Sequence, residues 1–239
     1  FGKGIFAMTG IIGAMPVEVD RLIEAMENKT PETISRMTFW RGELNGTPCV
    51  VACCGAGKVN SAVCAQTMIL RYGVSLVINT GVAGGVGSRE VRIGDLVVAT
   101  GVVQHDYDTT PIDGPEGGRR LPLLDEELLP TDAHASAVLA QEAEALSPGR
   151  VHRGVIDTGA QYMSHLNPLH PIAARTGALA CEMEGGSIGQ ACALAGVPFT
   201  VLRAISDNAD GNAVEDFPKF ARESAEKSIA LLLRALPRL

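Results

Sequence analysis

The chain has 239 residues, of which 46% are hydrophobic, and this is enough apolar material for one α/β domain with a large core. Its formal net charge of −7 argues against a surface for nucleic acid or an anionic membrane, so we expect neither as a partner. The six cysteines form no Cys-x-x-Cys pair and lie in apolar runs, which predicts a reducing, cytoplasmic environment without disulfides or a zinc site.

The first third of the chain begins with a segment that fits no helix or strand. We expect Phe1–Ala7 to be a leader outside the domain, with Met8 as the natural start. Asn45-Gly46 separates two apolar runs and is the typical sequence of a two-residue hairpin turn. The elements predicted here are a strand over Thr9–Met15, a helix from Val17, hairpin strands over Thr38–Leu44 and Pro48–Cys54, and a helix that follows the loop Gly55–Lys58 and runs to about Tyr72.

The middle of the chain continues with strands and one long excursion. The run Pro111–Pro130 is rich in proline, glycine and charge, and loops of this length are usually lids or binding elements. We find no repeat and no break in composition, so we predict a single domain over residues 9–239. The remaining predicted elements are strands over Ser75–Thr80, Asp95–Thr100 and Val151–Asp157, a helix over Asp132–Leu146, and a closing helix over Phe217–Leu236.

The stretch 178–210 combines clear secondary-structure signals with a dense group of polar residues. It predicts a strand over Ala178–Met183, a helix over Glu184–Ala195 that ends at Gly196, and a strand over Phe199–Ile205. Strands joined through a helix are usually parallel with a right-handed crossover, so their carboxyl ends would open on the same edge of the sheet. On spacing alone, the polar group is either a ligand site or a set of surface acids on a solvated loop. The polar residues at the two strand ends are Glu182, Glu184, Arg203, Ser206 and Asp207.

Four further positions each have a functional and a structural interpretation. Glu18 lies at a strand-to-helix junction, where surface glutamates are common because they complement the helix dipole. The glycines of Gly81–Gly85 require that the backbone closely approach a ligand or a neighbouring strand. Tyr162 and Met163 follow a strand and form either a flat apolar shelf for a planar ligand or part of the core. For His105-Asp106 we favour a structural or interface role.

Neither glycine-rich loop has the spacing of a nucleotide-binding motif. The loop Gly55–Lys58 has Ala52 where the Walker pattern needs glycine, and Val59 where it needs serine or threonine. The segment Gly81–Gly85 does not follow the Gly-x-Gly-x-x-Gly pattern of dinucleotide sites. We therefore reject a nucleoside triphosphate or dinucleotide site at either loop.

Four motifs, in the same order along the chain, carry a resemblance to the nucleoside phosphorylase/hydrolase family. They are IIGAMPVEV at 11–19, GAGKVNSA at 55–62, INTGVAGG at 78–85, and EMEGGSI with VLRAISDNAD within 182–210. The resemblance covers nearly the whole chain from about Gly10. It implies a single-domain, three-layer α/β/α fold with a twisted, mixed central sheet, a homodimer, and no metal or cofactor. The implied activity is hydrolysis of the N-glycosidic bond of 5′-substituted adenosines, such as methylthioadenosine and S-adenosylhomocysteine, to adenine and a thioribose.

The resemblance also implies a role for individual residues. Glu18 would activate the attacking water with help from Arg203, and Asp207, backed by Ser206, would protonate N7 of the purine. Tyr162 would stack on the base and the backbone of Met163 would pair with it. The other positions implied to bind substrate are Met183 and Glu184 at the ribose, Met15 and Phe217 at the 5′-alkylthio group, and Ala83, Gly84 and Glu182.

Departures from the family pattern leave open which 5′ substituent of the substrate is preferred. Val82 stands where many relatives have a hydroxyl residue, Ala160 replaces a frequent acid, and Ala56 replaces a larger apolar residue. Pro16-Val17 replaces a pair of glutamates before Glu18. The alternatives are a futalosine or aminofutalosine hydrolase, a purine nucleoside phosphorylase, or a non-catalytic nucleoside-binding protein. Phosphorylases of the family have an arginine before the glycine turn, where this chain has Asn79-Thr80, so hydrolysis is favoured.

Overall fold

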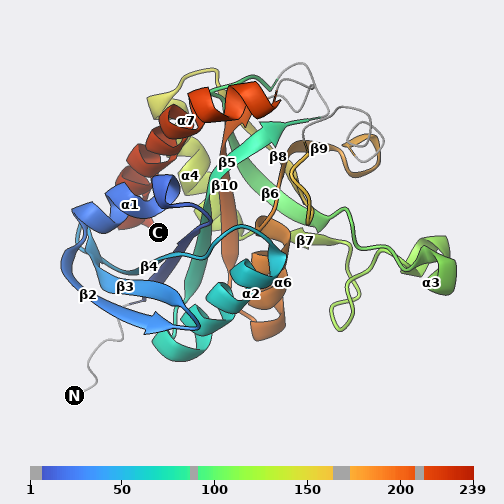
Figure 1. The fold of residues 1–239 in the computed structure, drawn as a ribbon, viewed down its shortest axis with the longest axis horizontal. Helices are drawn as coiled ribbons and strands as arrows, with labels where there is room; N and C mark the ends of the chain where they lie inside the picture. Colours follow the sequence, from blue (N-terminus) through green and yellow to red (C-terminus); the bar gives the residue numbers. More distant parts are fainter. Residues whose placement is uncertain (1–6, 87–90, 164–172, 208–212) are drawn as a thin grey trace.

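A mixed β-sheet with helices on both faces makes up the computed structural model of the chain (Figure 1). The structure describes residues 7–86, 91–163, 173–207 and 213–239, the stretch 213–219 by its backbone alone. The strands are β1 (Thr9–Gly13), β2 (Glu27–Ile34), β3 (Met37–Leu44), β4 (Thr47–Cys53), β5 (Leu76–Gly85), β6 (Leu96–Gln104), β7 (Leu128–Pro130), β8 (Val151–Thr158), β9 (Ala178–Glu182) and β10 (Phe199–Asp207). The helices are α1 (Pro16–Ala25), α2 (Lys58–Thr67), α3 (Thr110–Gly117), α4 (Ala133–Leu146), α6 (Gly185–Ala195) and α7 (Ala213–Ala235), with a π-helical turn η1 (Met68–Tyr72) and a 3-10 turn η2 (Leu236–Arg238).

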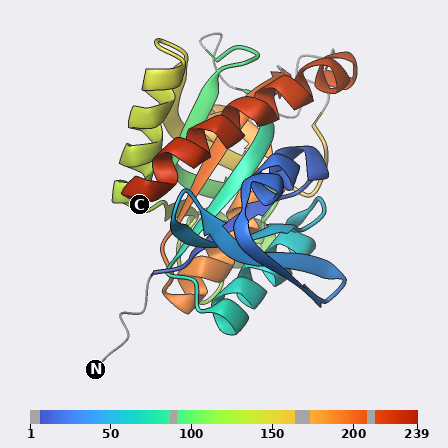
Figure 2. The ribbon, with the colours of Figure 1, turned by 90° about the vertical axis from the view of Figure 1, so that its left-hand side faces the viewer.

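Two apolar layers separate the sheet from its helices. On one face, α1, α4 and α7 bury residues such as Leu22, Leu139 and Leu232, and Figure 2 shows α7 crossing in front of the strands. On the other face, α2 and α6 bury residues such as Ala65 and Ile188. The predicted three-layer α/β/α fold with a mixed sheet is confirmed. None of the helices in the described ranges is long and apolar enough to cross a membrane.

Five strands of the sheet pair in a closed ring. β5 pairs with β10 in parallel, β10 with β6 antiparallel, β6 with β8 and β8 with β9 in parallel, and β9 with β5 antiparallel. The prediction that β9 and β10 run parallel to each other is therefore wrong. The crossover rule applies to strands that share one open sheet, whereas here β5 lies between the two and they pair with it in opposite directions.

This reversal still brings the polar ends of β9 and β10 together. Cys181 of β9 pairs with Gly84, and because β9 runs against β5, its last residue, Glu182, points back along β5. Arg203 of β10 pairs with Gly81 in the same part of β5. The end of β9 thus meets the middle of β10 at the glycine-rich end of β5.

Most other elements agree with the sequence predictions. Asn45 and Gly46 have φ of 49° and 76°, as the predicted hairpin turn requires, and Gly196 ends α6 with φ of 68°. Strand β2 was not predicted, because its residues are mostly exposed and carry no alternating pattern. β5 continues through Gly81–Gly85, which the sequence analysis placed after the strand. The excursion 111–130 contains α3 and ends in β7, and Figure 1 shows α3 on an arm that extends from the body.

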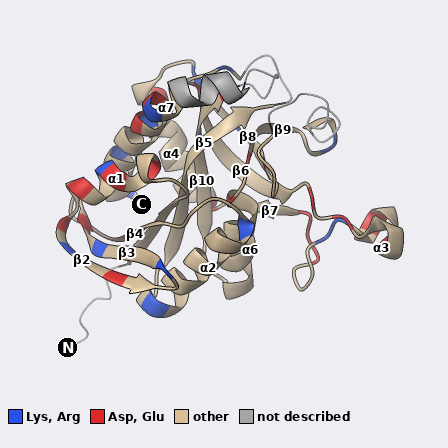
Figure 3. Cartoon of the chain, viewed as in Figure 1, with Lys and Arg blue, Asp and Glu red and all other residues tan. Residues whose placement is uncertain are grey.

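Charged residues lie mainly on the helices, the hairpin and this arm, whereas the central strands are mostly uncharged (Figure 3). Against this background Arg203 is unusual, because it lies in the middle of a central strand and is only 1% exposed. A buried cation is costly unless carboxylates and other acceptors surround it. The groups that surround Arg203 are therefore candidates for a functional site.

Candidate active site

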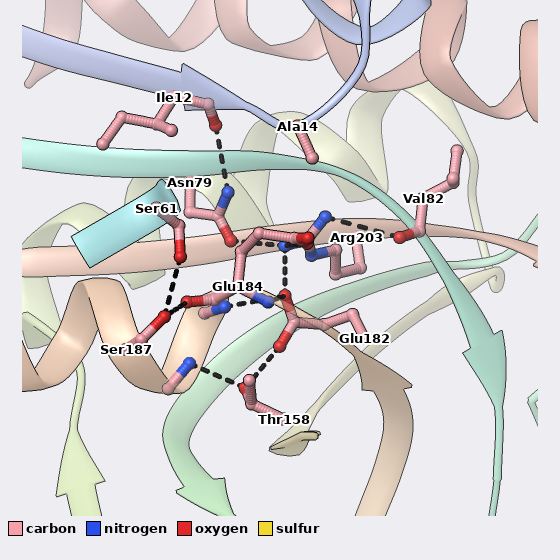
Figure 4. A network of polar contacts seen from close by, with 12 residues as sticks. Ile12, Ala14, Ser61, Asn79, Val82, Thr158, Glu182, Glu184, Ser187 and Arg203 are labelled. Atoms are coloured by element: carbon pink, nitrogen blue, oxygen red, sulfur yellow. Dashed lines mark hydrogen bonds and ion pairs between the residues drawn. The ribbon is translucent and has the colours of Figure 1, made fainter. Parts of the chain in front are cut away.

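Arg203 is the centre of a buried polar network (Figure 4). Its Nη2 atom donates to Glu182 and to Oδ1 of Asn79, and it lies 3.4 Å from Oε2 of Glu184. Nη1 donates to the carbonyl oxygen of Val82 at 3.4 Å. Burial works against the charge, but the carboxylates of Glu182 and Glu184 raise the pKa of Arg203, so it remains a cation. The network joins β5, β9, β10 and α6.

The carboxylate of Glu18 and the guanidinium of Arg203 both lie next to Gly81. Its Oε2 accepts the N–H groups of Ala14 at 2.7 Å and Met15 at 2.9 Å, and its Oε1 accepts that of Val82 at 3.0 Å. A Cβ atom on Gly81 would lie 2.5 Å from Oε1 of Glu18 and would also collide with Nη1 of Arg203. Glycine at position 81 thus lets the carboxylate and the guanidinium approach one another.

The burial of Glu18 decides between its two interpretations. The side chain is 2% exposed, so the interpretation as a surface glutamate is wrong. Burial raises the pKa of Glu18, against the opposing effects of Arg203 and of three backbone N–H groups. A carboxylate with raised proton affinity, next to a fixed cation, is suited to accept a proton from water.

Glu184 connects the network to the glycine loop before α2. It is the residue before the first turn of α6, and its Oε1 accepts the N–H of Gly57 at 2.9 Å. Burial, assisted by the neighbouring Glu182, raises the pKa of Glu184 to about 7. Ser187 donates to the carbonyl of Glu184 at 2.7 Å and contacts Ser61 of α2 at 2.7 Å. The start of α2 therefore holds the carboxyl group of Glu184, and Ser187 of α6 holds its backbone.

Glu182 links this network to a pocket. Its oxygens accept the N–H groups of Glu184 and Gly185, at 2.9 and 2.7 Å, and the hydroxyl of Thr158, in addition to Arg203. Beside it lies a small, partly open pocket. The pocket is lined by Gly84, Gln161, Tyr162, Met163, Cys181, Glu182, Met183 and Asp207.

Asp207 forms one wall of this pocket at the end of β10. It is 2% exposed, and Oγ of Ser206 donates to its Oδ2 at 3.0 Å. The hydroxyl of Ser206 also lies within hydrogen-bond distance of the carbonyl of Ala83, at 3.4 Å. Ser206 and Ala83 therefore lie behind the pocket, which Asp207 lines. Tyr162 also lines the pocket and is 47% exposed, so it belongs to an open apolar shelf and not to the core. An acid and an aromatic ring that share a pocket suit a planar, basic ligand.

Residues 9–237 match the family described as the Phosphorylase superfamily. The chain belongs to this superfamily. It is 34% identical to the 5′-methylthioadenosine/S-adenosylhomocysteine nucleosidase of Shewanella halifaxensis, over 96% of this chain and 99% of that protein. Identity to the nucleosidase of Bacillus subtilis is also 34%, over 96% and 98% of the two chains.

Solved structures of the superfamily share the fold closely. The nucleosidase of Neisseria meningitidis in complex with methylthio-immucillin-A has a TM-score of 0.91 and 31% identity, and the match covers 97% of this chain and 99% of that one. A futalosine hydrolase mutant of Helicobacter pylori has a TM-score of 0.90 and 31% identity, with 98% and 100% covered. The predicted resemblance to the nucleoside phosphorylase/hydrolase family is confirmed.

The predicted site residues fall into two adjoining groups that share Glu182. The first surrounds Arg203, and the second lines the pocket. Met15 contributes its backbone N–H to Glu18, while its side chain packs against the core. Phe217 lies outside the residues whose side chains the structure describes. The first group is Glu18, Glu182, Glu184 and Arg203, and the second is Gly84, Tyr162, Met163, Glu182, Met183 and Asp207, with Ala83 and Ser206 behind it.

Three residues of this superfamily site were not identified from the sequence. Asn79 donates to the carbonyl of Ile12 at 3.0 Å and accepts from Arg203, so it fixes the guanidinium against β1. Thr158 donates to Glu182 and accepts the N–H of Gly186 at 2.6 Å. Gly57 donates to Glu184. An amide in the otherwise apolar run SLVINT was a signal for Asn79, and the glycine loop 55–58 within the motif GAGKVNSA was a signal for Gly57. Thr158 carried none beyond its place at the end of a strand.

In the His105-Asp106 pair, the contacts of Asp106 agree with the structural role that we favoured. Asp106 forms an ion pair with Lys58 at 2.6 Å and accepts the N–H of Ala160 at 2.8 Å, so it ties the start of α2 to the segment that leads to Tyr162. Within the parts of the chain that the structure describes, no group of three or more His, Cys, Asp or Glu side chains is arranged to hold a metal ion.

Proposed function

We propose that this protein hydrolyses the N-glycosidic bond of 5′-substituted adenosines, such as methylthioadenosine and S-adenosylhomocysteine, and releases adenine. The observation that carries the proposal is the pocket that Asp207, Tyr162 and Glu182 share, with the Glu18–Arg203 pair directly behind Glu182. Full-length similarity to nucleosidases that are named for these two substrates supports it. So does the fold shared with a nucleosidase bound to methylthio-immucillin-A.

The charge balance of the site suits this reaction. Breaking the bond builds positive charge on the ribose and negative charge on the departing base. Three buried carboxylates, those of Glu18, Glu182 and Glu184, surround the single cation Arg203, which leaves an excess of acid groups. Such an excess stabilises positive charge as it develops at the sugar carbon, because there is little water to screen it.

The proton transfers are assigned to two acids at opposite sides of the site. Glu18 takes a proton from the attacking water as its oxygen bonds to C1′ of the ribose, and Arg203 orients this carboxylate. The bond from C1′ to N9 breaks, and Asp207, supported by Ser206, delivers a proton to N7 of the leaving adenine. Glu18 contacts Val82 and Asp207 pairs with Gly84, so the two acids meet β5 at positions that are separated by one residue, Ala83.

The remaining contacts are assigned to the pocket walls. Tyr162 stacks on the purine, and the backbone of Met163 pairs with it. Met183 and Glu184 contact the ribose, and Oε2 of Glu184 is suited to accept a ribose hydroxyl because its contact with Arg203 is long, at 3.4 Å. Met15 and Phe217 are the residues that we assign to the 5′ substituent, while Gly84 lines the pocket and Ala83 lies behind it.

Replacing Asp207 with asparagine tests this proposal. The amide cannot supply the proton, so we expect kcat for methylthioadenosine to fall by about 10²–10⁴-fold. The affinity for a non-hydrolysable adenosine analogue, measured by calorimetry, should stay within about threefold, since the shape of the pocket is retained. Near-normal adenine release by the variant would remove Asp207 from the mechanism. Absence of adenine release by the wild-type protein would contradict the proposed function itself.

A futalosine-type nucleoside is the second candidate substrate, because the structure of a futalosine hydrolase mutant is also closely similar. Both substrate types present a 5′-substituted ribose to the same network. The comparison of kcat/KM on methylthioadenosine, S-adenosylhomocysteine and the futalosine nucleosides distinguishes them. Running the same assay with added phosphate, and testing for ribose 1-phosphate, separates hydrolysis from phosphorolysis.

We also propose that the protein acts as a homodimer in the cytoplasm, in methionine salvage. The dimer is supported by Ile112 and Leu123, which are 87% and 92% exposed on the arm that carries α3. All six cysteines are free, which fits a reducing compartment. The pathway follows from the proposed substrate, since methylthioadenosine retains the methylthio group of methionine.

A further inference from the structure

The strand that carries Asp207 leaves its regular pairing just before this residue. In the pairing of β10 with β5, Ile205 faces Ala83 and Asp207 faces Gly84, so Ser206 is an extra residue in a bulge. On its other side, the ladder between β10 and β6 ends at Ala204 and Leu96. A bulge of this kind re-aims the side chains next to it, and its geometry must be held by other contacts.

A tight turn before β6 supplies those contacts. The N–H of Gly94 donates to the carbonyl of Ile205 at 2.8 Å, and the N–H of Ile205 donates to the carbonyl of Asp95 at 2.9 Å. Both backbone polar groups of Ile205, two residues before Asp207, are thus bound by Gly94 and Asp95. Ser224 of α7 adds a third bond, from its hydroxyl to the carbonyl of Ile205 at 3.1 Å.

The carboxylate of Asp95 closes this turn on itself. The N–H of Asp95 donates to the carbonyl of Arg92 at 2.9 Å, and its Oδ2 accepts the N–H of Arg92 at 3.1 Å. Gly94 has φ of 81°, a conformation that favours glycine, so the turn has little freedom to be rebuilt with another residue there. Without the carboxylate, the turn would keep its backbone bond and the bonds that Arg150 and Lys227 donate to the carbonyls of Ile93 and Gly94, at 2.7 and 3.4 Å, but the N–H of Arg92 would lose its acceptor.

Two side chains from the neighbouring strand hold the carboxylate in place. Nε of Arg150, just before β8, donates to Oδ1 of Asp95 at 2.8 Å, and Nε2 of His152 lies 2.9 Å from Oδ2. Asp95 is 4% exposed, yet burial is outweighed by His152 and Arg150, which lower its pKa. The group is an anion at neutral pH and belongs to no part of the mechanism described above.

We propose that Asp95 is a positioning residue for Asp207. Its carboxylate fixes the turn 92–95, the turn fixes both polar backbone groups of Ile205, and Ile205 sets the direction in which Asp207 enters the pocket. This inference rests on the proposed function, in which Asp207 donates a proton to the leaving base.

The variant Asp95→Asn tests the inference with two substrates. We expect kcat for methylthioadenosine to fall by about 10–100-fold, with KM and adenine affinity changed less than about threefold, because a small displacement of the acid slows proton transfer without altering the pocket. A 5-methylthioriboside of 4-nitrophenol has a leaving group that departs without a proton. Its hydrolysis should slow less than about threefold. Asp207→Asn should show the same selectivity, while Arg153→Gln, which removes an exposed arginine from the same strand β8, should match the wild type.

Equal losses on both substrates by Asp95→Asn would mean a general structural role and would overturn the inference. Should Asp95→Asn fail to fold, Arg150→Gln serves instead, since Arg150 is about half exposed. This substitution removes one of the two side-chain partners of the carboxylate, together with the bond from Arg150 to the carbonyl of Ile93 in the same turn. It should lower kcat for methylthioadenosine alone, by about threefold to tenfold. An unchanged ratio between the two substrates in Arg150→Gln would also overturn the inference. An Asp207→Asn variant of normal rate would remove Asp207 from the mechanism and overturn the inference with it. An inactive wild-type protein would instead contradict the proposed function.

Discussion

Asp157, at the end of β8, is a buried acid that the proposed mechanism does not use. It is fully buried, and its Oδ2 accepts the hydroxyl of Thr176 at 2.8 Å. Its Oδ1 has no hydrogen-bond partner among the described residues. Burial raises the pKa of Asp157 to about 7, although Thr176 works in the opposite direction. The folded protein therefore binds a proton here that the unfolded chain releases near pH 4.

The raised pKa of Asp157 should make the free energy of unfolding depend on pH. Between about pH 4 and pH 7 the folded state holds more protons than the unfolded state, so the contribution of Asp157 to stability is lost as the pH rises. The Asp157→Asn variant has no carboxyl group to titrate at this position. Its free energy of unfolding, relative to that of the wild type, should therefore rise by up to roughly 4 kcal/mol between pH 4 and pH 8. Urea unfolding of both proteins across this range measures the difference. Parallel stability profiles would contradict the assigned pKa.

Gly81 is the residue at which the site is most sensitive to added volume. A Cβ there would meet both Glu18 and Arg203, neither of which can move without leaving a buried charge unpaired. Gly81→Ala should lower kcat/KM by about 10²-fold or more, because displacement of catalytic groups by about 1 Å has effects of that size. Gly117→Ala on α3 is the matched control, because a Cβ there meets only an ordinary contact at 3.6 Å. This variant should keep the kcat/KM of the wild type.

At the scale of elements, the site depends on how the start of α2 meets the start of α6. The N–H of Gly57 anchors Glu184, and Ser61 contacts Ser187 between the two helices. Gly57 has φ of 102°, and no atom lies within 4 Å of the position of a Cβ. A substitution here would strain the backbone without a steric clash.

Gly57→Ala should therefore raise KM more than it lowers kcat. Relief of the strain moves the loop and weakens its hydrogen bond to Glu184. Hydrogen bonds to charged groups are worth about 2 kcal/mol, so we expect KM to rise about tenfold or more. Gly149→Ala is the matched control, since Gly149 also has positive φ and open space but lies in the turn before β8. The control should lose about 1 kcal/mol of stability and keep its KM. A normal KM in Gly57→Ala would exclude Glu184 from ribose binding.

For the whole molecule, the arm that carries α3 provides the exposed apolar surface expected at an interface between copies. A double variant with Ile112→Glu and Leu123→Glu would place charges on that surface, and charges are costly to bury between subunits. We expect light scattering to give twice the chain mass for the wild type and the chain mass for the double variant. Glu116→Gln on the same arm keeps the apolar side chains and should stay dimeric. A monomeric wild type would refute the proposed homodimer.

The long-range pairing of strands was beyond what local patterns could predict. The sequence placed Glu182 correctly at the end of a strand, but Arg203 lies in the middle of β10, which continues to Asp207. The predicted relative direction of the two strands was wrong as well, because β5 lies between β9 and β10. Glu18 was ambiguous for a similar reason. Its sequence neighbours are those of an ordinary helix start, and its burial results from β5 and β10, which lie far along the chain.

The sequence by itself determined the elements that depend on neighbouring residues. The Asn45-Gly46 hairpin, the end of α6 at Gly196 and the order of the four family motifs follow from local backbone preferences and from spacing along the chain. Only the tertiary structure decided that the sheet closes into a ring, that Glu18 is buried, and that one arginine is shared by distant carboxylates. The physical reason is that burial and charge pairing arise between segments far apart in the chain, so they depend on the complete fold.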